Sequence, residues 1–142
     1  MIEIARADLR RICDHAEAVY PEECCGLLVG EVRSDGTVAI GSVEPSRNLA
    51  EDRRRRFEVD TRLRLDLQRR LRTGTARIVG LYHSHPDKSA QPSRHDLDMA
   101  WEPDMVWLIV AVERGQAIQV SGHRPAADGS RFEPLAAITL DR

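Results

Sequence analysis

The sequence lacks the features of a nucleic-acid-binding, membrane-spanning or secreted protein. Its formal net charge is only −2, so it has no overall basic field to attract nucleic acid or an acidic membrane. No apolar run approaches the roughly 20 residues that span a bilayer. The first residues have neither the basic segment nor the apolar core of a signal peptide. We therefore expect a cytoplasmic protein with no nucleic-acid or membrane partner.

Cysteine is scarce, and its spacing excludes the common cysteine-based sites. The three cysteines are Cys13, Cys24 and Cys25, and no Cys-x-x-Cys pair is present. That absence argues against a structural zinc site built from thiolates and against the Pro-Cys-x-x-Cys signature of a zinc nucleobase deaminase. We expect three reduced, partly buried thiols. A catalytic cysteine is the alternative, although the sequence offers no obvious base beside Cys24 or Cys25.

The composition and the hydrophobic periodicity indicate one α/β domain over residues 1–142. Hydrophobic residues make up 42% of the chain and charged residues 31%, which are ordinary values for a globular protein. Alternating helices and strands favour a mixed β-sheet with helices on its faces. We expect Trp101 and Trp107 to pack in the core or against a helix. The patterns predict helices over 7–19, 60–73 and 93–102, a loop over 44–57, and strands over 25–30, 38–43, 76–83, 105–112, 116–121 and 132–140.

Two histidines end one of these strands. His83 and His85 follow an apolar run that contains the β-branched residues Ile78 and Val79. Side chains alternate across a strand, so residues two apart lie on the same face and both imidazoles can converge on one point. Imidazole is the commonest protein ligand for zinc. The spacing therefore favours a metal site over two unrelated surface histidines.

Ser93 and Asp96 have two compatible interpretations. Ser93-Arg-His-Asp96 fits a variant of the helix capping box, with Ser93 as the N-cap and an acidic residue in the first turn. The carboxylate of Asp96 could also turn toward a metal. His83, His85 and Asp96 would then supply the three protein ligands that are typical of a catalytic zinc site, with a fourth position left open.

The same stretch resembles the motif of a metalloprotease family. It reads Gly-Leu-Tyr-His83-Ser-His85-Pro, six residues, then Ser93-x-x-Asp96. Every fixed position matches His-Ser/Thr-His-Pro, six residues, Ser-x-x-Asp, the motif of the JAMM metalloproteases, also called MPN+ or JAB. The resemblance runs from about residue 8 to residue 121. It implies a single-domain, mixed, curved β-sheet flanked by helices, of the MPN/JAB type, which is cytidine-deaminase-like.

Spacing alone does not select a general base, because Glu22 and Glu23 both lie about 60 residues before the histidines. Solvated positions in a turn are the simplest interpretation of both. In the JAMM family a glutamate belongs to a Glu-x-x-Gly segment that opens a buried strand, and Glu23-Cys-Cys-Gly26 resembles that segment. The resemblance therefore implies Glu23.

The resemblance also implies a role for each site residue. His83, His85 and Asp96 would bind zinc. Glu23 would take a proton from the attacking water and later pass it to the leaving amine. Ser93 would donate a hydrogen bond to the oxyanion of the tetrahedral intermediate.

The family resemblance implies a zinc-dependent metallopeptidase that hydrolyses an amide or isopeptide bond. Its substrate would be the Gly-Gly tail of a ubiquitin-like or sulfur-carrier protein, since small stand-alone bacterial members resemble this chain best. The segment 87–92 is only six residues long, and the insertions that hold ubiquitin in eukaryotic deubiquitinases are not evident. The alternative is a non-catalytic MPN-type interaction scaffold that retains a metal site.

The arginine run Arg53–Arg56 has a simple interpretation and a functional one. It reads as a solvated loop, partly neutralised by nearby acidic residues. The alternative is that the loop contacts an acidic carrier protein and steers its approach.

Overall fold

The computed structural model describes residues 1–140, so the last two residues of the predicted domain lie outside the described part. Within that part, one mixed β-sheet contains eight strands, of which three neighbouring pairs are parallel and four are antiparallel. The strands, in order across the sheet, are β7 (Phe132–Leu135), β6 (Gln116–Pro125), β5 (Val106–Glu113), β4 (Arg77–Pro86), β2 (Cys25–Val32), β3 (Val38–Ser46), β1 (Ile2–Ala5) and β8 (Ala137–Leu140). The predicted fold class, a mixed sheet with flanking helices, is confirmed.

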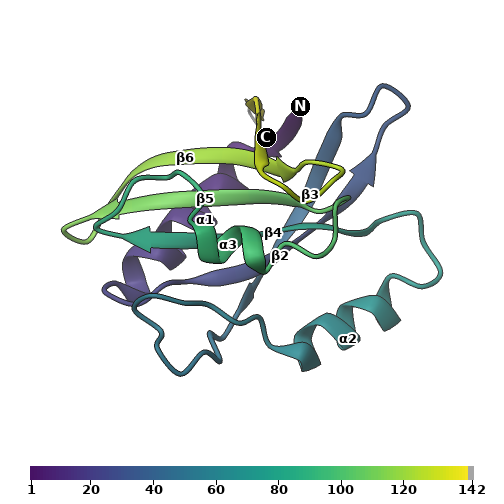
Figure 1. Cartoon of the computed structure of the whole chain (residues 1–142). Coiled ribbons are helices and arrows are strands. Elements are labelled where there is room, and N and C mark those ends of the chain that lie inside the picture. Colours follow the sequence, from purple (N-terminus) through teal and green to yellow (C-terminus); the bar gives the residue numbers. More distant parts are fainter. Residues whose placement is uncertain (141–142) are drawn as a thin grey trace.

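Helices cover both faces of the sheet. Helix α1 (Arg6–Val19) buries Ile12 and Ala16 against one face, in a core that also contains Leu28, Tyr82 and Leu108. On the other face, α2 (Thr61–Arg70) packs through Leu67, and the short α3 (Arg94–Asp98) follows β4. Figure 1 shows α1 behind the strands and α3 in front of them.

The register across the central strands decides which side chains share a face with α3. His83 on β4 lies opposite Cys25 on β2 and Ile109 on β5, and Ile109 lies opposite Ser121 on β6. Directly opposed residues point to the same side of a sheet. His83 and Ser121 therefore lie on one face, and His85 joins them two residues further along β4.

Gly26 on β2 leaves room for the ring of Tyr82 of β4 on the opposite, α1-side face of the sheet. A β-carbon at position 26 would lie only 2.3 Å from the ring of Tyr82, which is fully buried on β4. A larger residue would push Tyr82 away and disturb the strand that carries the histidines. This contact gives a physical reason for the glycine in the segment Glu23-Cys-Cys-Gly26.

The predicted helix over 93–102 is too long. It begins after Ser93 as expected but ends at Asp98, well before Pro103. Only Asp96 of this helix is buried, so no apolar stripe stabilises further turns. The prediction for Trp101 is consequently wrong: its side chain is 77% exposed, and its indole N–H donates to the carbonyl of Asp98. Trp107, in contrast, is buried on β5 as predicted.

The predicted last strand, 132–140, is two strands on opposite edges of the sheet. β7 pairs with β6, whereas β8 pairs with β1, a four-residue strand that periodicity did not predict. Only Ala136 separates β7 from β8, so the sheet must curve until its two edges come close together. This curvature agrees with the curved sheet that the family resemblance implies.

The segment between β3 and α2 is mostly irregular, as expected, but its first residues are not. β3 continues through Ser46, so residues 44–46 are strand and not loop. β1 pairs with β3 only at Val38 and Ala39, which leaves this end of β3 as an edge where Pro45 is tolerated. Asp60 caps α2 by accepting a hydrogen bond from the backbone N–H of Arg62. None of the helices in residues 1–140 has the length and apolar content that crossing a membrane requires.

Candidate metal centre

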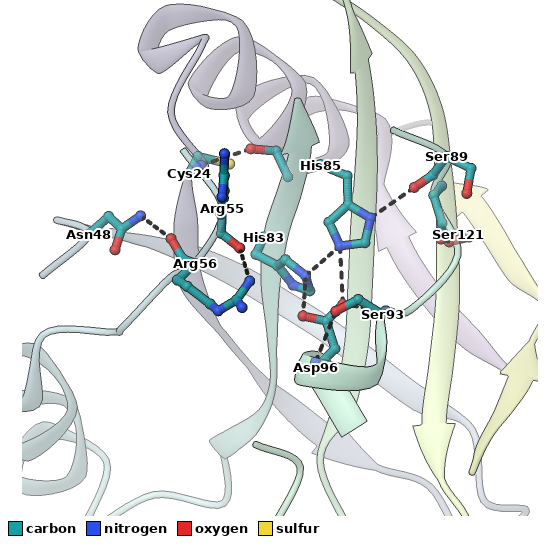
Figure 2. A network of polar contacts seen from close by, with 12 residues as sticks. Cys24, Asn48, Arg55, Arg56, His83, His85, Ser89, Ser93, Asp96 and Ser121 are labelled. Atoms are coloured by element: carbon teal, nitrogen blue, oxygen red, sulfur yellow. Dashed lines mark hydrogen bonds and ion pairs between the residues drawn. The ribbon is translucent and has the colours of Figure 1, made fainter. Parts of the chain in front are cut away.

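The structure brings together the three residues that the sequence suggests as metal ligands. His83 Nε2 lies 3.1 Å from His85 Nε2 and 3.2 Å from Asp96 Oδ1, and His85 Nε2 lies 3.1 Å from Asp96 Oδ2. All three side chains are buried. Figure 2 shows them pointing toward one another from the end of β4 and the start of α3. Two imidazoles and a carboxylate converge on a space in which a single cation can contact all three.

The hydrogen bonds around His85 direct its second nitrogen into the cluster. His85 Nδ1 lies 2.8 Å from the carbonyl oxygen of Ser89, which can only accept, so Nδ1 carries a proton. Such a bond from the far nitrogen fixes ring orientation in metal-binding histidines. Nε2 is thereby presented toward His83 and Asp96. The donor set, two imidazoles and one carboxylate, fits a divalent metal of the zinc type.

The charge of the metal-free cluster follows from burial and from its internal bonds. Burial lowers the pKa of His83. Burial is the largest single influence on His85 and would lower its pKa, but the hydrogen bonds to Asp96 and to the Ser89 carbonyl, together with the negative charges of Asp96 and Glu23, outweigh burial and raise that pKa. Burial alone would raise the pKa of Asp96, but its bonds with His83 and His85 hold that pKa below the ordinary value. Without a metal the cluster therefore favours a proton on His85 and an ionised Asp96 more than free side chains would, and a metal ion competes with that proton for His85.

Ser93 lies at the rim of the cluster and caps α3. Its Oγ accepts a hydrogen bond from Asp96 N, and its backbone N–H donates to Asp96 Oδ2, which completes a capping box. The capping interpretation of the sequence is therefore confirmed, and the same residue steers the Asp96 carboxylate toward the histidines. Among the described residues no acceptor is found for the hydroxyl proton of Ser93, so that proton remains free to donate.

The structure distinguishes Glu23 from Glu22 clearly. Glu23 is 3% exposed, close enough to His85 and Asp96 for their charges to affect its titration. Glu22 is only partly buried and forms an ion pair with Arg53 at 3.2 Å. Glu23 also borders an open cavity of about 480 Å³ between the end of α1 and the loop after β3. The metal-ligand residues are not among those that line this cavity.

Glu23 has the pKa of a group that titrates near neutral pH. Burial raises the pKa of Glu23 to about 7, although the positive charge of His85 opposes the shift. A general base works best when its pKa lies near the working pH. Glu23 can therefore accept and return a proton under ordinary conditions.

This shift predicts how the stability of the metal-free protein depends on pH. The pKa of Glu23 is higher in the folded than in the unfolded chain, so its contribution to stability is full below about pH 4.5 and lost as pH rises through about 7. The loss amounts to about 3 kcal/mol. Glu23→Gln should thus match wild type at about pH 4 and exceed it by about that amount at about pH 8. Urea unfolding in EDTA measures this, and equal differences at both pH values would contradict the shift.

Comparison of the sequence with models of known protein families agrees with this arrangement of residues. The sequence model of the family described as prokaryotic homologs of the JAB domain matches residues 5–121. The chain belongs to the prokaryotic JAB family. The match covers the two histidines, Ser93, Asp96 and Glu23, and its limits agree with the extent of the motif resemblance.

Individual JAB-like relatives cover most of the chain. A CysO-cysteine peptidase of Mycobacterium tuberculosis is 27% identical over 140 residues, which cover 95% of this chain and 90% of that protein. A desampylase of Haloferax volcanii is 33% identical over 89 residues, which cover 63% of this chain and 62% of that protein. The solution structure of a protein from Desulfitobacterium hafniense superposes with a TM-score of 0.85 at 26% identity, covering 100% of this chain and 94% of that one. The named relatives support a JAMM-type peptidase, and the superposition supports the fold.

Sequence reasoning missed two residues that hold this JAB site in place. Phe57 stacks on His83 with ring centroids 4.3 Å apart, whereas His83 Nδ1 has no hydrogen-bond partner among the described residues. Asn48 donates from its side-chain amide to the carbonyls of Glu23 and Arg56. Both lie in the aperiodic stretch after β3, where the local sequence gives no sign that they contact residues as far away as His83 and Glu23.

The buried cysteines beside the site are poor nucleophiles. Cys24 and Cys25 are buried, and all three cysteines are free thiols, as expected. Burial raises the pKa of both buried thiols to about 12, so the nucleophilic thiolate is scarce at neutral pH. Ser84 points away from the metal face, because its Oγ accepts a hydrogen bond from Cys24 N on the opposite side of β4.

Proposed function

We propose that this JAB protein is a zinc-dependent metallopeptidase that cleaves an amide or isopeptide bond at the Gly-Gly tail of a ubiquitin-like or sulfur-carrier protein. The observation that carries the proposal is the convergence of His83, His85 and Asp96 beside a buried Glu23 that titrates near pH 7. The name of the mycobacterial relative describes a peptidase acting on CysO-cysteine, which supports a carrier-type substrate.

His83, His85 and Asp96 are the proposed zinc ligands. When bound, zinc supplies Lewis acidity that activates water near neutral pH and polarises an amide carbonyl. The ligand set leaves room for water and substrate, since three protein ligands are typical of catalytic rather than structural zinc. The hydrogen bond from His85 Nδ1 to Ser89 holds that ligand in position.

Glu23 is the proposed general base and acid. Its carboxylate accepts the proton of the attacking water, and its burial makes the resulting carboxylic acid stable enough to hold that proton. The same proton then goes to the amine that leaves. Glu23 also borders the open cavity at the end of α1, which the proposed zinc ligands do not line.

Ser93 is the proposed oxyanion donor. Its Oγ is fixed at the N-terminus of α3 by the bond from Asp96 N, so its hydroxyl proton can be preorganised toward charge that develops on the substrate. Removing one such donor commonly costs about 10²- to 10³-fold in turnover. Ser93→Ala would also weaken the helix cap, so its effect on stability must be measured alongside.

The proposed activity can be tested directly. Zinc-loaded protein is incubated with ubiquitin-like and sulfur-carrier proteins that carry one amino acid, or a lysine-linked peptide, after the Gly-Gly tail. Intact-mass spectrometry should show release of that residue or peptide and a carrier ending in Gly-Gly. A zinc-loaded protein that cleaves none of them would favour the scaffold alternative.

The arginine run offers a prediction about carrier binding. The segment 47–77 contains eleven arginines and five acidic residues, so it is locally basic although the whole chain has a net charge of −2. Arg54 and Arg55 are exposed, and this loop reaches the site through Phe57. If an acidic carrier docks here, Arg54→Glu with Arg55→Glu should raise KM for carrier cleavage roughly tenfold at low salt. Hydrolysis of a short Gly-Gly peptide should not change, and an equal loss on both substrates would contradict carrier steering.

A further inference from the structure

Two polar residues of β6, the partly buried Ser121 and the buried His123, lie on the metal face but outside the ligand cluster. Ser121 lies opposite Ile109 and His123 lies opposite Trp107, and these β5 residues in turn lie beside His83 and Leu81 of β4. His123 is only 4% exposed. Neither residue belongs to the JAMM motif.

Ser121 and His123 form a short hydrogen-bonded chain that ends on the loop between the ligands. Ser121 Oγ contacts both the carbonyl oxygen of Ala90 and His123 Nε2, the latter at 2.7 Å. The carbonyl can only accept, so the serine hydroxyl donates to Ala90. His123 Nε2 must then carry a proton and donate to Ser121 Oγ. The chain of bonds therefore runs in one direction, from His123 through Ser121 to Ala90.

The loop that receives this bond lies directly over β5. Ala90 is 1% exposed and packs on Ile109 and Ala111. The carbonyl just before it, that of Ser89, accepts the bond from His85 Nδ1. Figure 2 shows Ser89 and Ser121 on the side of His85 away from Asp96.

The two ends of this loop are held by different contacts. At its start, Asp87 accepts hydrogen bonds from Tyr20 Oη and from the backbone N–H of Arg114, at 2.6 and 2.9 Å. At its end, Ser93 begins α3. Between them, the bond from Ser121 to the Ala90 carbonyl fixes the middle of the loop, next to the Ser89 carbonyl that His85 Nδ1 contacts.

We propose that His123 and Ser121 are positioning residues for the metal centre, which hold the loop 87–92 so that the Ser89 carbonyl keeps His85 in its ligand orientation. The inference rests on the proposed metal site. It concerns residues that do not touch a ligand and act on His85 through the loop that carries Ser89. Loss of an outer partner of a metal-binding histidine typically costs about 10- to 100-fold in metal affinity. Breaking the chain at either residue should cost a similar factor.

The test uses the metal alone. Zinc affinity is measured by chelator competition, and the visible spectrum of the Co²⁺-loaded protein reports ligand geometry, for wild type, Ser121→Ala, His123→Leu and His123→Gln. Ser121→Ala and His123→Leu should weaken zinc binding about 10- to 100-fold and alter the cobalt spectrum. His123→Gln should stay within about threefold of wild type, because its amide nitrogen can replace Nε2 as the donor.

A matched control separates positioning from general stability. His15→Leu removes a comparable bond, between His15 Nδ1 and Tyr82 Oη at 2.8 Å, on the α1 side of the sheet. It should lower the melting temperature without changing zinc affinity or the cobalt spectrum. If His15→Leu weakens zinc binding as much as His123→Leu, or if folded Ser121→Ala and His123→Leu bind zinc like wild type, the inference is wrong. A wild-type protein that binds no zinc would overturn the proposed function and this inference together.

Discussion

Replacement of His85 by alanine should abolish high-affinity zinc binding while leaving the protein folded. His85 is the central member of the cluster, with Nε2 at 3.1 Å from both His83 Nε2 and Asp96 Oδ2. Losing an outer partner of such a ligand already costs about 10- to 100-fold in affinity, so losing the ligand itself must cost more. Only His83 and Asp96 would remain, and two ligands do not enclose a catalytic zinc ion.

The fold should survive this change because the main core lies on the other face. That core joins α1 to Val79 and Tyr82 of β4 and to the even-numbered residues of β5, and His85 is not part of it. The free energy of unfolding should fall by about 1–3 kcal/mol, the usual cost of leaving buried polar partners such as the Ser89 carbonyl unpaired. A typical domain of this size has several times that stability.

Elemental analysis and chelator competition measure the metal, and circular dichroism checks the fold. The matched control is His95→Ala, since His95 lies on α3 next to Asp96 but does not contribute to the cluster. It should bind about one zinc per chain, like wild type. Stoichiometric, tight zinc binding by His85→Ala would rule out the assigned ligand set.

The ligand cluster could be predicted from the sequence because its parts are local. His83 and His85 share a strand face by alternation, and Asp96 follows within one short loop and one helical turn. Ser93 was identified as an N-cap by the same local rules. These features depend on backbone geometry over a few residues, so they are readable without knowing the fold.

Glu23 and the residues that support the cluster depend on pairings between distant strands. Glu23 reaches the site because Cys25 lies opposite His83, across a separation of 58 residues. Ser121 and His123 reach it through the parallel pairing of β4 with β5 and the antiparallel pairing of β5 with β6. The residue pattern within a single strand does not show which residues of a distant strand it will pair with. Family resemblance selected Glu23 because it carries that non-local information, and it gave no guide to Asn48 or Phe57.

The sheet edges were hard to predict for a related reason. β1 has only four residues, too few for a reliable period, and its two neighbours are β3 and β8 from opposite ends of the chain. The split of 132–140 into two strands follows from closure of the curved sheet around Ala136, where the carbonyl accepts a bond from Ile2 N. Tertiary pairing, and not intrinsic propensity, decides such short strands.

Glu23→Gln should retain zinc and lose most of the turnover. The glutamine has nearly the same shape as a protonated glutamate, so the packing around this buried side chain, 3% exposed, is preserved. Neither His83, His85 nor Asp96 changes, and zinc affinity should remain within a few-fold of wild type. What is lost is the ability to accept a proton, because an amide is not basic near neutral pH. General acid–base catalysis contributes about 10²- to 10⁴-fold, so kcat should fall by that factor.

The adjacent residue supplies the control for this experiment. Glu22→Gln makes the same chemical change one position away, where the side chain is 40% exposed and pairs with Arg53 at 3.2 Å. An exposed pair of this kind contributes only about 0–1 kcal/mol, so kcat for a short Gly-Gly peptide should stay close to wild type. Single-turnover kinetics on zinc-loaded proteins distinguish loss of chemistry from loss of substrate binding. Near-normal turnover by Glu23→Gln, or an equal fall in both variants, would show that Glu23 does not transfer the proton, and the base would have to be sought elsewhere around the cluster.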